Sequence, residues 1–96
     1  MIFAVIDNNA SIFDTWPEYH AATFSPDCTV SACIPLQLHG STYAARKDSL
    51  RTIAQDIQSA DNGGMSYSEA ADMAEWLTTN ARRYGLVNEF RDNGII

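Results

Sequence analysis

Apolar and polar positions along the chain change period several times, and each period predicts one kind of element. Residues 2–7 begin with five apolar side chains, and after two asparagines an extended pattern resumes at residues 10–14. Two such runs joined by residues that suit tight turns predict a β-hairpin. Residues 29–38 alternate between apolar and polar side chains, which predicts a half-buried strand. Pro35 favours an edge position for this strand, because proline has no N–H to give to a ladder.

Helical spacing governs the rest of the chain. Thr15 and Glu18 have the spacing of a capping box and predict a short helix over residues 16–22. Apolar residues recur every three or four positions over 43–60 and over 67–84, which predicts two longer helices. The letters DNGG predict the end of the first of these. The 96 residues are therefore expected to form a single α+β domain, a three-stranded antiparallel sheet with helices packed on one face.

The N-terminal letters FAV and SIFDTWPEY resemble a known family, the small hybrid-binding domain of eukaryotic ribonuclease H that also occurs in a plant-virus inclusion protein. The match covers residues 3–20, and the order of elements extends it to about residue 55. The matching positions are Phe3, Ala4, Val5, Ile12, Phe13, Thr15, Trp16 and Glu18. The resemblance implies a surface that binds RNA–DNA hybrid through basic and glycine-rich groups around the hairpin turn. Here that turn reads DNNA and has no basic residue.

Trp16 lies at the centre of this resemblance and has two possible roles. Its indole could stack on a nucleic-acid base. Large aromatic side chains more often pack in a core, so we expect Trp16 to be buried over the sheet and Thr15 to cap the short helix.

Charge changes the functional picture. Twelve carboxylates oppose six Lys and Arg residues, the net charge is −6, and residues 1–45 contain no Lys or Arg. Nucleic-acid binding needs clustered basic residues, so direct contact with nucleic acid is not expected. On the second long helix, carboxylates recur every three residues and have a further aspartate nearby. This set predicts a negative surface that docks on a basic protein and consists of Asp61, Glu69, Asp72 and Glu75.

These features together predict a small protein-binding inhibitor of a basic, nucleic-acid-handling complex. In size, acidity and lack of catalytic motifs the chain is similar in type to phage anti-CRISPR and anti-restriction proteins, although it shares no residue motif with them. The alternative is a nucleic-acid-binding module of the kind that the ribonuclease H resemblance implies. A third possibility is a domain that only mediates oligomerisation.

A second candidate site lies at the start of the first long helix. Ser41 and Thr42 precede this helix, and Arg46 and Lys47 lie in its first turns. A helix start with free N–H groups and flanking cations can hold an anion. The same cations could instead pair with the surplus carboxylates of the chain, and the sequence leaves both possibilities open.

Other chemistry is not expected. The chain has no phosphate-loop, dinucleotide, zinc-protease or nucleophile-elbow motif, so we predict no enzyme activity, catalytic residue or cofactor. Its histidines and cysteines match no compact zinc pattern and no disulfide framework; they are His20, His39, Cys28 and Cys33. No apolar run reaches the length of about 18 residues that a transmembrane helix needs. The opening letters MIFAVID lack a signal-peptide lead-in, and a cytoplasmic location is expected.

Overall fold

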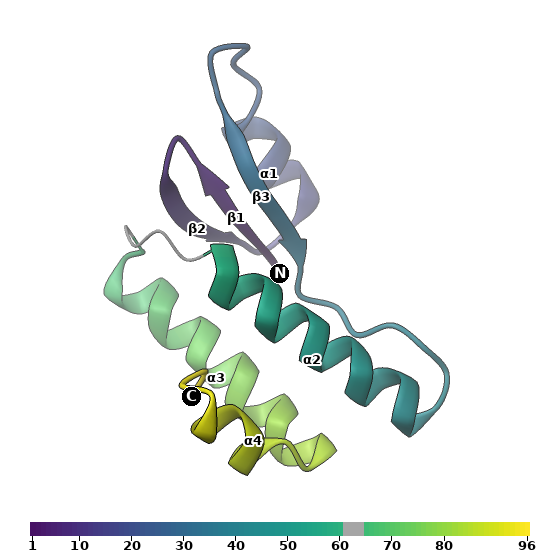
Figure 1. Cartoon of the computed structure of the whole chain (residues 1–96). Helices are drawn as coiled ribbons and strands as arrows, with labels where there is room; N and C mark the ends of the chain where they lie inside the picture. The colour runs from purple at the N-terminus through teal and green to yellow at the C-terminus, as the bar shows by residue number, and fades with distance from the viewer. Residues whose placement is uncertain (61–64) are drawn as a thin grey trace.

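The computed structural model describes residues 1–60 and 65–96, and it confirms the predicted α+β fold. Its sheet has three strands. Figure 1 shows a short helix behind this sheet and the longer helices on the opposite side. The helices are α1 (Trp16–Ala22), α2 (Tyr43–Ala60), α3 (Tyr67–Tyr84) and α4 (Val87–Asp92). The first three have the predicted bounds. The letters DNGG, expected to end α2, lie outside the described residues.

The sheet is antiparallel, with β1 (Ile2–Ile6) between β2 (Asn9–Phe13) and β3 (Val30–Pro35). The β1–β2 turn consists of Asp7 and Asn8, whose φ angles are 51° and 67°. Two successive positive φ angles characterise the tight hairpin turn that suits the strand twist, and Asp and Asn tolerate this conformation. Strand β3 lies at an edge, as Pro35 predicted, but it is shorter than the predicted strand over 29–38.

The two faces of the sheet have different covers. Phe3 and Val5 point toward α2 and α3, together with their cross-strand partners, and they belong to the main core. Ile2 and Ala4 occupy the opposite face, where they are 2% and 0% exposed. Helix α1 covers this second face, and Tyr19 packs its ring edge-on against Phe13 at 5.7 Å.

The expectation that all helices share one face of the sheet is therefore wrong for α1. The reason lies at the end of β2. Phe13 pairs with Ile2, so its side chain lies on the same face of the sheet as Ile2, the outer face that points away from α2 and α3. The chain enters α1 directly beyond Phe13. Helix α1 therefore lies on the face of the sheet where Tyr19 can pack against Phe13.

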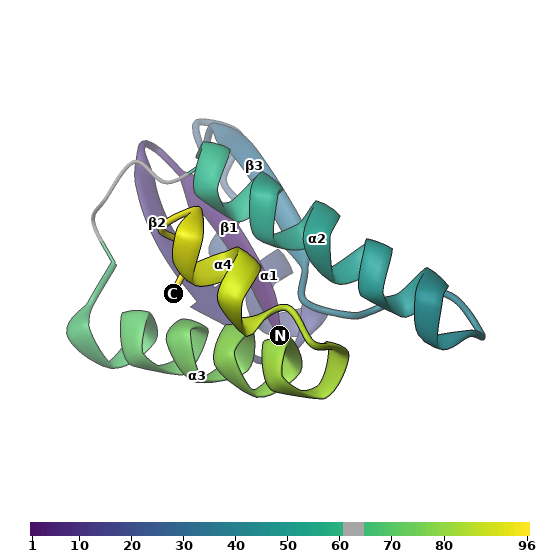
Figure 2. The same cartoon turned by 60° about the horizontal axis from the view of Figure 1, so that its bottom comes forward.

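Helices α2 and α3 run side by side in opposite directions, with α4 lying against them (Figure 2). The rings of Tyr43 and Tyr84 meet at 5.3 Å where α2 begins and α3 ends. Serine and glycine set the ends of α3: the Ser66 hydroxyl accepts from the Glu69 N–H, and Gly85 adopts a left-handed conformation with φ 70°. The buried residues of the helices, together with Leu86 between α3 and α4, are Leu50, Ile53, Ala54, Ile57, Met73, Leu77, Ala81, Tyr84, Leu86 and Phe90.

Candidate functional site

Two of the predicted acidic residues stand exposed on α3, beside a shallow surface hollow. Asp72 and Glu75 line this hollow together with Met1 and Trp76, and Thr79 and Asn80 complete it. Its volume is about 400 Å³. Trp76 is half-buried and packs against the core, so its ring is held in place. The result is an apolar floor with a negative rim, a combination that suits a basic side chain.

Glu69 belongs to the same predicted row but has a structural role. One carboxylate oxygen, Oε2, accepts the backbone N–H of Ile12 at 2.7 Å, and the other, Oε1, accepts the Ser66 hydroxyl at 2.9 Å. The Ile12 N–H lowers the pKa of Glu69 below its ordinary value, with a smaller contribution from Ser66, and partial burial opposes the shift. Glu69 therefore joins α3 to β2, and it is half-buried.

The ladder geometry explains why Ile12 needs this acceptor. The N–H of Leu36 donates to the carbonyl of Met1 at 2.8 Å, so odd-numbered β1 residues bond to β3 and even-numbered ones to β2. Ile12 lies opposite Phe3 and consequently turns its N–H away from β1. The Glu69 carboxylate accepts this outward N–H, which would otherwise be an unpaired donor on the open edge of the sheet.

Asp61, the fourth member of the predicted set, lies outside the described residues. The structure thus divides the predicted set: it places Asp72 and Glu75 together at the hollow and assigns Glu69 to the fold.

The predicted anion site has internal partners for several of its groups. The Thr42 hydroxyl accepts the N–H of Ala45 at 3.1 Å, and Arg46 donates from Nε to the Tyr84 hydroxyl at 2.8 Å. Lys47 lies close enough to Glu89 to contribute to the lowered pKa of that carboxyl. Ser41 is exposed. The anion site stays a prediction, while these contacts tie the start of α2 to α3 and α4.

An ion pair extends this connection along α2. Arg51 contacts Glu89 on α4 through two hydrogen bonds, from Nε at 2.9 Å and from Nη2 at 3.1 Å, and it also meets Asp48 at 3.2 Å. The Arg51 guanidinium is the main cause of the lowered pKa of Glu89. Because both side chains are more than one-third exposed, solvent screens the pair, and it orients α4 more than it stabilises the fold.

Sequence reasoning missed an aromatic cluster on α1. Trp16, expected in the core, is 45% exposed, and no residue of α1 is fully buried. Its ring stacks on His20 at 5.9 Å and meets the edge of Tyr19 at 5.6 Å. The burial prediction fails because Tyr19, and not Trp16, faces the sheet: the Cys33 thiol of β3 lies beside the Tyr19 hydroxyl and raises its pKa. The Thr15 cap is confirmed, with its hydroxyl accepting the Glu18 N–H at 3.4 Å.

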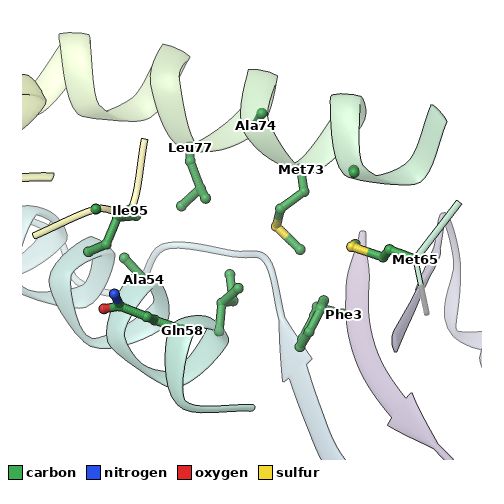
Figure 3. Close-up of a pocket in the computed structure, with 11 residues that line it drawn as sticks. Phe3, Ala54, Gln58, Met65, Met73, Ala74, Leu77 and Ile95 are labelled. Carbon is green, nitrogen blue, oxygen red and sulfur yellow. The ribbon is translucent and has the colours of Figure 1, made fainter. Parts of the chain in front are cut away.

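An apolar cavity of about 230 Å³ lies between α2, α3 and β1 (Figure 3). Phe3 lies on its sheet side, and the thioethers of Met65 and Met73 approach from α3 and the segment before it. Its polar lining residue Gln58 donates from Nε2 to the Asn93 carbonyl at 3.0 Å. In the described part of the chain, no buried side chain is polar or charged. The cavity therefore brings no pair of reactive groups together.

The thiols and imidazoles do not gather. Cys28 is half-buried and Cys33 exposed, and both are free. Within residues 1–60 and 65–96, no three His, Cys, Asp or Glu side chains come together in a way that could hold a metal ion.

Comparisons with protein-family models, with curated proteins and with solved structures gave no match to this chain. Of the helices in the described ranges, none combines the length and the apolar character needed to cross a membrane.

Proposed function

We propose that this protein is a protein-binding inhibitor and that its partner is a basic protein that handles nucleic acid. The observation that carries the proposal is the hollow on α3, where Asp72 and Glu75 flank Trp76. A lysine or arginine of the partner would lay its aliphatic stem on the apolar floor and bring its charge to the carboxylate rim. A groove that normally receives phosphates would then be filled by these carboxylates.

The charge balance supports the same partner class. With a net charge of −6, the protein is attracted to basic surfaces over a distance of about 8 Å at physiological salt. Such complementarity raises association rates and selects partners more than it adds affinity. An anti-defence role like that of small phage inhibitors is the particular form of this proposal, and it rests on similarity of type.

A second candidate function is nucleic-acid binding, as the ribonuclease H resemblance implies. The observation in its favour is the exposed indole of Trp16, since an open aromatic face can stack on a base. The charges near it oppose this function, because residues 1–45 contain no Lys or Arg to neutralise phosphates. A gel shift with duplex, hybrid and single-stranded nucleic acid separates the two candidates: the inhibitor shifts none of them.

The direct test of the inhibitor proposal is an affinity pull-down from the host cell with two baits. One bait is the wild-type protein, and the other carries Asp72→Lys with Glu75→Lys. We expect a basic protein to be retained by the first bait and lost from the second. Equal retention of the same protein by both baits would contradict contact through the hollow on α3.

A further inference from the structure

Helix α1 and the outer face of the sheet form a layer whose charge differs from that of the rest of the molecule. The six Lys and Arg residues all lie on the helices that cover the opposite face: Arg46, Lys47 and Arg51 on α2, Arg82 and Arg83 on α3, and Arg91 on α4. The segment that builds β1, β2, α1 and β3 carries carboxylates and no Lys or Arg. The sheet thus separates the basic side chains from the α1 layer.

An aromatic cluster occupies this layer and comprises Phe13, Trp16, Tyr19 and His20. Tyr19 lies at its centre, with ring centroids 5.7 Å from Phe13, 5.6 Å from Trp16 and 5.5 Å from His20. The Trp16 and His20 rings stack with an interplanar angle of 28°. Mutual contacts of this kind hold aromatic rings in place before any partner arrives.

The position of the cluster leaves the Trp16 ring available to a partner. Tyr19 and His20 follow Trp16 by three and four positions, so their rings neighbour the indole on the surface of α1, and Phe13 on β2 meets Tyr19 from the sheet. Trp16 is nearly half exposed although it is anchored on two sides. Large aromatic residues held in this way are frequent energetic centres of protein interfaces.

Carboxylates lie at the same end of α1. The Glu18 carboxylate accepts the backbone N–H of Asp14 at 3.3 Å, which places it at the start of the helix, and the Asp14 side chain is exposed. The surroundings of the cluster therefore attract cations and repel phosphates. Among cationic side chains, the planar guanidinium of arginine stacks best on an indole face.

We infer that the aromatic cluster is a docking surface for an arginine-bearing segment of a protein partner, with one guanidinium stacked on Trp16. The inference uses the partner class of the proposed function, a basic protein, but assigns it a second contact on the layer opposite α3. Nothing in it depends on the hollow beside Trp76.

The test uses a fluorescein-labelled hexa-arginine peptide and the full-length chain. Its affinity is measured by anisotropy for wild type, Trp16→Ala and Tyr67→Ala. Tyr67 is the matched control, because it is 92% exposed and lies on α3 on the other face of the sheet. We expect Trp16→Ala to weaken binding about 5- to 30-fold, the range of one desolvated cation–π contact, and Tyr67→Ala to leave it within about twofold.

A second measurement keeps the test sound if Trp16→Ala disturbs the helix. Trp76→Phe leaves Trp16 as the only tryptophan, and hexa-arginine should then change its emission saturably, while hexa-lysine of equal charge should bind more weakly. Peptide binding that leaves the Trp16 emission unchanged, or that is equally strong in Trp16→Ala, would overturn the inference.

Two further outcomes would assign the cluster to a different occupant and so also overturn it. One is self-association of the peptide-free protein that Trp16→Ala abolishes, which would make the occupant a second copy. The other is a response of Trp16 to an oligothymidylate that exceeds its response to hexa-arginine. The pull-down with Asp72→Lys and Glu75→Lys does not depend on any of these results. Docking at the aromatic cluster can therefore be disproved while contact through the hollow on α3 stands, and contact through the hollow can be disproved while docking at the cluster stands.

Discussion

Replacing Glu69 by Ala should destabilise the fold, because this carboxylate stabilises an edge of the sheet. The Ile12 N–H donates to Oε2 over only 2.7 Å, the length of a charge-assisted hydrogen bond, across 57 residues of sequence. Hydrogen bonds to charged groups contribute about 1.5–3 kcal/mol, and removing the acceptor leaves a partly buried donor unpaired. The N-cap of α3 survives the change, since Ser66 Oγ accepts the backbone N–H of residue 69.

We therefore expect Glu69→Ala to lower the free energy of unfolding by about 1.5–3 kcal/mol. For a domain of this size, about 2 kcal/mol corresponds to a fall in Tm of about 8–16 °C. Urea unfolding followed by circular dichroism measures the effect. Glu75→Ala is the matched control, because Glu75 is exposed on the same helix and should change stability by no more than about 0.5 kcal/mol.

The pH dependence offers an independent check. The pKa of folded Glu69 lies below its ordinary value of 4.5, so its contribution is fully present above pH 4.5 and is lost as pH falls through the lowered value. The stability difference between wild type and Glu69→Gln should accordingly narrow on acidification below pH 4.5. Equal stability of Glu69→Ala and Glu75→Ala would show that the bond from Ile12 to Glu69 does not stabilise the sheet edge. A stability difference between wild type and Glu69→Gln that did not depend on pH would show the same.

Three further predictions concern other parts of the fold. Gly40→Ala should cost clearly more stability than Gly94→Ala in thermal melts. Both glycines have positive φ, a conformation that costs about 1–2 kcal/mol for any L side chain, but only at Gly40 would the new Cβ also lie 2.5 Å from the Cβ of Ala45. Equal losses of stability at the two positions would contradict the clash. Trp16→Ala should cost about 1–3 kcal/mol, from about 0.5–1.5 kcal/mol for each of its two aromatic pairs, and a loss of about 4–5 kcal/mol would instead mean a core residue. Arg51→Ala should lower Tm more at low salt than at 1 M salt, because its pairing with Glu89 is exposed; a salt-independent loss would show that packing dominates.

Local patterns in the sequence were sufficient to predict the first three helices and the presence of three strands. Thr15 and Ser66 provide caps within three residues of their partners, and the apolar repeats of α2 and α3 extend over whole helices, so the helix bounds were predictable. The hairpin was predictable for the same reason, because Asp7 and Asn8 suit its positive φ angles.

The site depended on contacts that no local pattern contains. Glu69 looked like one of three equivalent carboxylates until the fold brought Ile12 to it. The exposure of Trp16 depends on which side of α1 meets the sheet, and the seven residues of that helix give no clear apolar stripe. The aromatic spacing at 13, 16, 19 and 20 was visible in the sequence and could have been recognised as one surface.

If Asp72 and Glu75 make the partner contact, reversing their charges should slow association with the partner, which can be followed by association kinetics. The partner captured by the wild-type bait is measured against wild type, against Asp72→Lys with Glu75→Lys, and against a control with the same charge change, Asp56→Lys with Asp92→Lys, each at low and at physiological salt. All four carboxylates are exposed, so the two doubly substituted proteins should fold equally well. We expect salt to slow wild-type association, and the charge reversal on α3 to slow it well beyond the control. Association that is indifferent to salt, or that slows equally in both variants, would contradict contact through Asp72 and Glu75.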